Sequence, residues 1–175
     1  MPQAIPPSVA SHYEAAYQEL RRIARSQLNQ HQRTGMLDTT ALVHESFMRF
    51  AQANGADIVD KRHFLGYAAK VMRSVIVDAA RARNAERRGG DMHLTTLNSK
   101  IIENVTLENG VIRIDEVIDL LQAADPQLAQ IVELRFFAGL SVEEAAEVLG
   151  MSERTLYREW DKARLILIDA LREGT

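Results

Sequence analysis

The sequence contains no cysteine, which excludes disulfide bonds, thiolate metal sites and thiol redox chemistry. Aromatic residues are also scarce, at 6% of the chain, so aliphatic side chains must form most of the core that 46% hydrophobic residues can supply. No apolar run reaches the roughly 18 residues that a membrane-spanning helix requires. These absences predict a cytoplasmic protein without a membrane span.

Positive charge is not in excess, because the formal net charge is −3. This argues against a wholly basic nucleic-acid-binding protein but leaves local basic patches open. Walker, dinucleotide-binding and Gly-x-Ser-x-Gly patterns are all missing. His44-Glu45 begins a zinc-protease motif, but position 48 is Met, and the other histidines lack ligand spacing. We therefore predict no enzyme activity, no metal site and no cofactor.

Three of the four prolines lie in the first seven residues, without the basic flank and apolar region of a secretory signal. Residues 1–11 are therefore expected to form a disordered tail. Apolar residues then recur at spacings of three and four over residues 12–30, 38–53 and 61–87. That period predicts three amphipathic helices, which bury one another in a first small all-α domain, residues 12–88.

The pattern changes over residues 89–114, which are predicted to form a linker. Gly89-Gly90 opens a polar stretch, and NVTLENGVIRI follows with Asn109-Gly110 between two short β-prone runs. That dipeptide favours a tight hairpin turn. Because an isolated hairpin is only marginally stable in water, the linker is expected either to hold a short β-hairpin or to remain irregular.

Helical periodicity returns over residues 115–173, which are predicted to form a second small all-α domain. Asp125-Pro126 ends one helix and starts the next. Ser141-Val142-Glu143-Glu144 has the form of a capping box, and the helix that it opens ends at Gly150. Ser152 then caps a last helix that reaches about residue 172. A short helix, a glycine turn and a second helix are typical of a helix-turn-helix.

Basic residues lie where such a motif would meet DNA. Arg154, Thr155 and Arg158 occupy the start of the last helix, the part that enters the major groove in a helix-turn-helix. Lys162 lies further along and suits a backbone phosphate. A second basic cluster lies towards the end of the predicted third helix; it consists of Arg73, Arg81, Arg83, Arg87 and Arg88. The alternative for both clusters is a solvated basic helix face.

Two long stretches carry a resemblance to a known family. TTALVHESFMRF, followed by HFLGYAAKVMRSVIVDAARARNAERRGG, resembles region 2 of bacterial extracytoplasmic-function (ECF) sigma factors. LQAADPQLAQIVELRFFAGLSVEEAAEVLGMSERTLYREWDKARLIL looks like region 4 of the same family, so the resemblance covers residues 12–90 and 115–172. It implies two helical domains that bind core RNA polymerase and direct it to promoter DNA. Region 2 would hold the polymerase clamp and the minus-ten element, and region 4 the minus-thirty-five element.

The resemblance also implies roles for single residues. It puts Arg154, Thr155, Arg158 and Lys162 at the minus-thirty-five element and Arg73, Arg81 and Arg83 near the minus-ten element. Residues 54–63 match the loop that captures a flipped base, and Phe64 and Tyr67 would either stack there or join the core. The helix that would bind the polymerase clamp carries Asp38, Leu42, Val43, Glu45, Phe47, Met48 and Arg49.

The entrance to that clamp-binding helix departs from the family. Many members begin it with the acidic cluster Asp-Ala-Glu-Asp, which here falls on Asp38, Thr39, Thr40 and Ala41, so two of the three acids are missing. A phosphothreonine carries about −1.5 to −2 charges, enough to replace them. We therefore hypothesise that a Ser/Thr kinase activates the protein at Thr39 or Thr40. The alternative is that Asp38 or Thr39 only caps the helix.

Other functions are compatible with parts of the pattern. A stand-alone helix-turn-helix regulator would bind duplex DNA without polymerase, and an adaptor would bind only protein. Many ECF sigma factors are held by an anti-sigma protein, which makes such a protein a further candidate partner.

Overall fold

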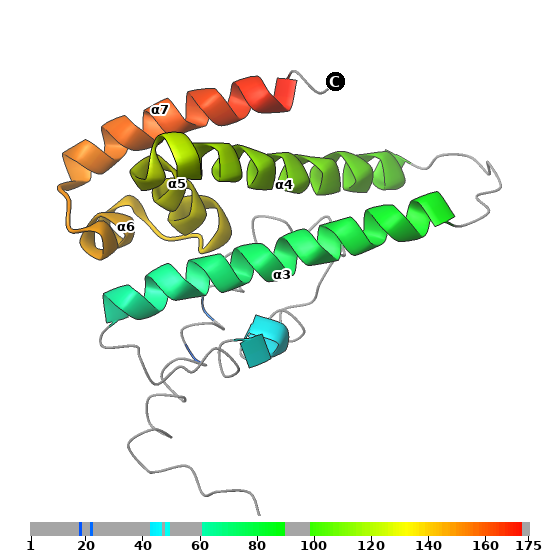
Figure 1. Ribbon diagram of the computed structural model, residues 1–175, viewed down its shortest axis with the longest axis horizontal. Helices are drawn as coiled ribbons and strands as arrows, with labels where there is room; N and C mark the ends of the chain where they lie inside the picture. Colours follow the sequence, from blue (N-terminus) through cyan, green and yellow to red (C-terminus); the bar gives the residue numbers. More distant parts are fainter. Residues whose placement is uncertain are drawn as a thin grey trace, which may run out of the picture.

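The computed structural model describes residues 18, 22, 43–46, 48–49, 61–89 and 99–172, with backbone alone for 61, 87–89 and 99–108. Every element of this part of the chain is helical, which confirms the all-α prediction. Six of these helical elements are described over their whole length. They are α3 (Lys61–Gly89), α4 (Ser99–Ala124), α5 (Pro126–Val132), the π-helix η2 (Glu133–Phe137), α6 (Val142–Leu149) and α7 (Glu153–Arg172) (Figure 1).

Helix α3 has 29 residues and forms one long side of the structure. Its apolar residues recur at helical spacing, and Leu65, Met72 and Val75 are all buried. The predicted third helix is therefore confirmed. Phe64 and Tyr67 were expected either to stack on a base or to join the core. Phe64 is buried in this core, and Tyr67 packs against it while partly buried.

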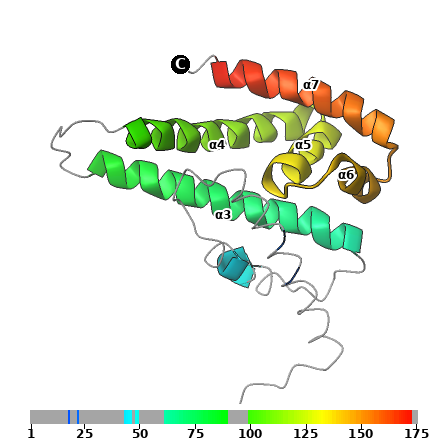
Figure 2. The ribbon, with the colours of Figure 1, turned by 180° about the vertical axis from the view of Figure 1, so that it is seen from behind.

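The hairpin considered for the linker is wrong, because Ser99–Ala124 is the single helix α4. Its residues Val111, Ile114 and Ile118 lie on one helical face and are buried. Helix α4 lies between α3 and α7 in both views of the molecule (Figures 1 and 2). Burial on this face outweighs the turn preference of Asn109-Gly110, since tertiary packing commonly overrides local propensity. The cost of a helical glycine is modest, and Gly110 lies close to Leu171 of α7.

The helix boundaries after α4 follow the sequence signals closely. Asp125 caps α5, where its carboxylate accepts a hydrogen bond from the Leu128 backbone N–H at 3.1 Å. Ser141 and Glu144 form the predicted capping box, with both reciprocal hydrogen bonds present. Gly150 ends α6 at φ 64°, a left-handed conformation that glycine adopts without steric cost. The predicted helix-turn-helix is therefore α6, its glycine turn and α7.

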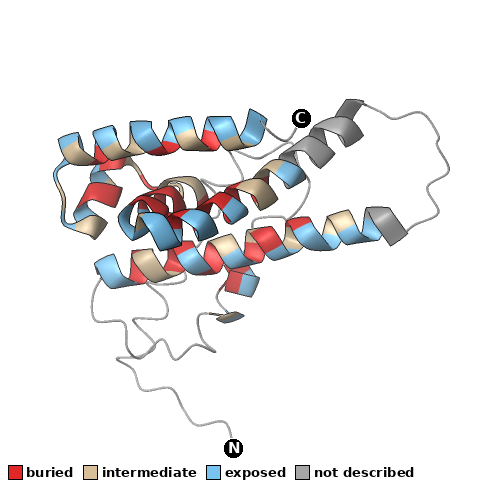
Figure 3. Cartoon of the chain, turned by 45° about the horizontal axis from the view of Figure 1, so that its top comes forward, coloured by how far each residue is buried: buried red, intermediate tan, exposed pale blue. Residues whose placement is uncertain are grey.

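The buried faces of α3 and of the C-terminal helices point towards each other (Figure 3). One hydrophobic cluster joins Leu65 and Met72 of α3 to Leu134, Leu140 and Leu156. A second joins α3 to α4, α5, η2 and α7; its α3 members are Val77 and Ala80. The division into two domains, residues 12–88 and 115–173, remains a prediction. In this arrangement α3, from the first predicted domain, packs against helices of the second in both hydrophobic clusters.

Within the described ranges, no helix combines the length and apolar character of a membrane span. The same part of the chain holds no group of three or more histidine or acidic side chains placed to bind a metal ion.

Candidate nucleic-acid interface

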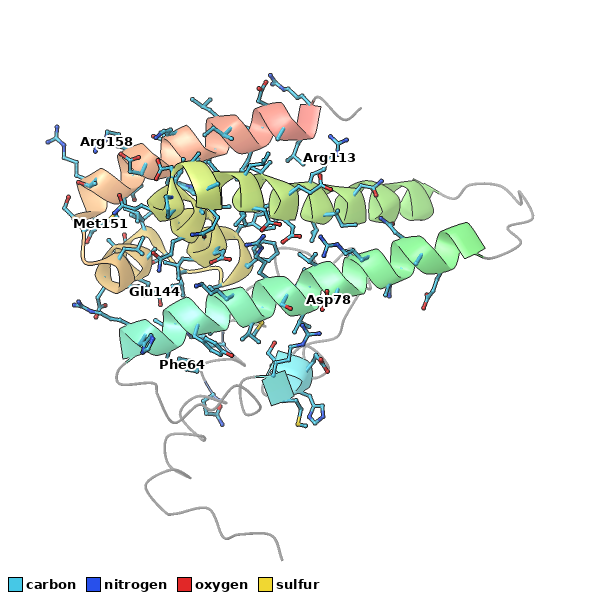
Figure 4. The ribbon with its side chains drawn as sticks, in the orientation of Figure 1. Phe64, Asp78, Arg113, Glu144, Met151 and Arg158 are labelled. Carbon is cyan, nitrogen blue, oxygen red and sulfur yellow. The ribbon has the colours of Figure 1, made fainter. Side chains whose placement is uncertain are left out.

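The start of α7 presents a polar face to solvent while its other face is fixed in the core. Leu156 is fully buried, and Ala163 and Leu167 continue the buried face further along the helix. Arg154 and Arg158 lie on the exposed side, and Arg158 projects outward near the beginning of α7 (Figure 4). The inward residues therefore fix the direction in which both arginines point.

The cap of α7 also orders Thr155. Its backbone N–H donates to the Ser152 hydroxyl at 3.2 Å, and the two side-chain oxygens are 2.9 Å apart. A hydroxyl held at the first turn of such a helix lies where side chains reach base edges or phosphates.

Partly buried carboxylates accompany the exposed cations of α7. Arg158 donates to Glu159 Oε1 from Nε at 3.1 Å and from Nη2 at 3.0 Å. Lys162 Nζ lies 3.2 Å from Asp125 Oδ2, and the hydrogen bond from Leu128 together with that from Lys162 lowers the pKa of Asp125. Surface ion pairs of this kind contribute little free energy, so a phosphate can replace the carboxylate as partner.

Arg135 of η2, which was not predicted from the sequence, contacts both the turn that follows η2 and helix α7. Its guanidinium lies over the Trp160 ring, with Cζ 5.1 Å from the centroid, and Nη1 donates to the Leu140 carbonyl. Burial lowers the pKa of Arg135. The cation–π contact connects η2 with α7, so Arg135 supports the orientation of the helix that carries Arg154 and Arg158.

Arg73 does not face solvent but lies at the centre of an ion-pair cluster. Its Nε lies 2.6 Å from Asp115 Oδ1, and Nη1 lies 2.9 Å from Glu133 Oε1. Nη2 lies 2.5 Å from Asp119 Oδ1 and also donates to the Asp115 carbonyl at 3.0 Å. Asp115 and Glu133 are only 6% and 5% exposed. We call these four residues, together with Arg81, the Arg73 cluster.

The protonated state of Arg73 is strongly favoured in this cluster. Burial alone would lower its pKa, but hydrogen bonds to Glu133, Asp119 and Asp115 outweigh burial and raise the pKa above its usual value. Arg81, with a side chain 54% exposed, adds a second cation at 2.7 Å from Asp115 Oδ2. Arg73 could therefore meet DNA only if the cluster opened, whereas Arg81 already lies at the surface. Arg83, also on α3, is partly buried.

Residues 43–46 and 48–49 form a helical segment against α3. Val43 is buried in the α3 core, and the Ser46 hydroxyl donates to the Met72 sulfur at 3.3 Å. Arg49 lies 3.0 Å both from Glu45 Oε1 and from Asp78 Oδ2, and Met48 is exposed. The other expected clamp-binding and phosphorylation residues lie outside the described part of the chain; they are Asp38, Thr39, Thr40, Leu42 and Phe47.

The structure thus brings the four residues expected at the minus-thirty-five element together on α7. The three arginines expected near the minus-ten element all lie on α3, and α4 packs against that helix. Asp115, Asp119 and Glu133 were missed as partners of Arg73. The available signal was the pair of aspartates four residues apart, which share one face of a helix.

A family model described as "ECF sigma factor" matches residues 8–173. No curated protein and no solved structure matches the chain.

Proposed function

The chain belongs to the ECF sigma factor family, and on this premise we propose how its residues serve transcription initiation. An alternative sigma factor of this kind acts with core RNA polymerase and promoter DNA as its partners. The observation that carries the residue-level proposal is the start of α7, where Arg154 and Arg158 are exposed above a fixed, buried face.

In this proposal α7 enters the major groove of the minus-thirty-five element. Arg154 and Arg158 read base edges, because an arginine pairs bidentately with guanine, and Thr155 and Lys162 bind the adjacent backbone. On α3, Arg73, Arg81 and Arg83 bind phosphates near the minus-ten element. The exposed Glu45 and Met48, with Arg49, contribute to the surface for the polymerase clamp. The protein acts in the cytoplasm.

The test is transcription in vitro from fragmented genomic DNA of the source organism, with core polymerase alone and with core polymerase plus this protein. Sequencing of the RNA 5′ ends should reveal discrete start sites that need the protein and share two upstream motifs. Start sites identical to those of core polymerase alone would contradict the proposal. Tight binding of the isolated chain to duplex DNA would instead favour a stand-alone regulator.

We further propose that phosphorylation regulates the contact with the polymerase clamp. The charge deficit at Thr40 and Ala41, next to Thr39, supports this, because the family's acidic cluster retains only Asp38 in this sequence. One phosphate would restore the missing charge at a helix N-terminus, where anions are stabilised. A Ser/Thr kinase is then a partner, and an anti-sigma protein is a second candidate regulator.

Phosphorylation at Thr39 or Thr40 is expected to tighten binding to core polymerase by about tenfold, which corresponds to about 1.4 kcal/mol. Phosphothreonine can be incorporated during synthesis at either position, and affinity measured against the unmodified chain at low and high salt. The gain should shrink at high salt, because screening weakens exposed charge pairs. Equal affinities for modified and unmodified protein would refute the switch. Asp38→Asn serves as the matched charge control and should weaken binding.

A further inference from the structure

Acidic residues of α4 and η2 occupy the arginines of α3 that we assign to promoter DNA. All three nitrogens of the Arg73 guanidinium have an oxygen partner in the protein, from Asp115, Asp119 or Glu133. Arg81 donates to the second oxygen of Asp115 at 2.7 Å. Carboxylate and phosphate oxygens use the same hydrogen-bond geometry with arginine, so each would exclude the other.

The contact between α3 and α4 extends well beyond these charges. Val77 and Ala80 of α3 belong to one buried cluster with Val111 and Ile114 of α4. Further along, the Asn84 side-chain amide donates to Asn109 Oδ1 at 3.0 Å. Because charged, apolar and amide contacts follow one another along the same pair of helices, α3 and α4 must separate as a unit before DNA can reach Arg73.

We propose that α4 is an intramolecular latch, whose Asp115 and Asp119, with Glu133 of η2, compete with promoter phosphate for Arg73 and Arg81. This inference rests on the proposed function, because it assigns a regulation to the same α3 surface. The latch holds the unbound chain closed and keeps it from DNA. Core polymerase opens the latch by binding the open arrangement more tightly than the closed one, as any ligand must to shift such an equilibrium.

The absence of cysteine allows a direct test. Asn84→Cys and Asn109→Cys place two thiols where the amides now meet, outside the residues assigned to DNA or polymerase. A short bis-maleimide containing a reducible disulfide would then join α3 to α4 in the closed state. Promoter-specific transcription by the linked protein with core polymerase should fall at least tenfold and recover when the linker is reduced.

The outcomes separate the two proposals. If the unlinked double variant yields protein-dependent start sites and the linked form transcribes equally well, the latch is wrong and the proposed function stands. If neither the wild type nor the unlinked variant yields such start sites, the proposed function fails first. Each single-cysteine variant treated with the same reagent controls for modification alone and should retain full transcription. Loss in a single variant equal to that of the linked form would overturn the latch.

A charge-matched pair provides a second readout that does not require a promoter. Asp119→Asn removes an exposed member of the Arg73 cluster, whereas Glu116→Gln removes the same charge from an exposed position on the same helix. Asp119→Asn should raise the affinity of the isolated chain for duplex DNA by about two- to fivefold, as expected for loss of an exposed ion pair. Equal gains in both variants would show a net-charge effect and would count against the latch.

Discussion

Replacing Arg73 with methionine is expected to lower the free energy of unfolding by about 3 kcal/mol, because the substitution leaves two buried carboxylates without their main cation. Asp115 and Glu133 are almost completely buried, so neither can recover the lost interaction from solvent. The loss in free energy of unfolding should lie near the lower end of the range for broken buried ion pairs, because Arg81 still contacts Asp115. Equilibrium unfolding in urea measures the change directly.

Two further variants distinguish the buried cluster from a general effect of losing positive charge. Adding Asp115→Asn and Glu133→Gln to Arg73→Met removes the uncompensated charges and should recover much of the lost stability. Arg81→Met removes an equal charge from a half-exposed side chain and should cost less than about 1 kcal/mol. An Arg73→Met variant no less stable than Arg81→Met would show that the cluster contributes little.

Local signals in the sequence were sufficient to place the helix ends that follow α4. Ser141, with Glu144 three residues on, and Gly150 are residues whose own chemistry sets a helix boundary, and the structure has the boundaries there. The family also followed from the sequence, because its motifs extend over long continuous stretches and the match to residues 8–173 confirms them.

The error at Asn109-Gly110 shows where local reasoning fails. The dipeptide favours a turn in isolation, but both of its residues have neighbours on other helices: Asn84 of α3 hydrogen-bonds to Asn109, and Leu171 of α7 lies near Gly110. Those partners lie 25 and 61 positions away in the chain, beyond any short-range pattern. The same reasoning applies to Arg73, whose position on α3 was predicted but whose carboxylate partners come from α4 and η2.

The candidate interface on α7 is more predictable, because it depends on one helix and its cap. Burial of Leu156 at a known helical register fixes which neighbours must face outward. Energy and specificity at such a surface still come from different residues. Phosphate contacts contribute affinity on any sequence, whereas contacts to base edges distinguish one sequence from another. Substitutions on α7 should therefore divide into those that lower affinity for any DNA sequence and those that weaken discrimination between sequences.

The double substitution Arg154→Ala and Arg158→Ala is expected to reduce promoter-specific transcription by on the order of a hundredfold, because each bidentate contact with a base contributes about 1–3 kcal/mol of discrimination. Lys162→Ala should weaken binding more evenly across sequences and reduce the salt dependence by about one phosphate contact. Run-off transcription at several salt concentrations, on the mapped promoter and on point variants of its upstream motif, separates these effects.

Arg164 supplies the matched control on the same helix. It is exposed like Arg154 and Arg158, and its nearest carboxylate, Asp161 Oδ1, is 3.9 Å away. It lies almost two turns beyond Arg158, past the part of the helix that would reach base edges. Arg164→Ala should therefore change transcription by no more than about fivefold, as for loss of a single phosphate contact. If Arg164→Ala costs as much as the double substitution, the effect comes from general positive charge, and base recognition at the start of α7 is wrong.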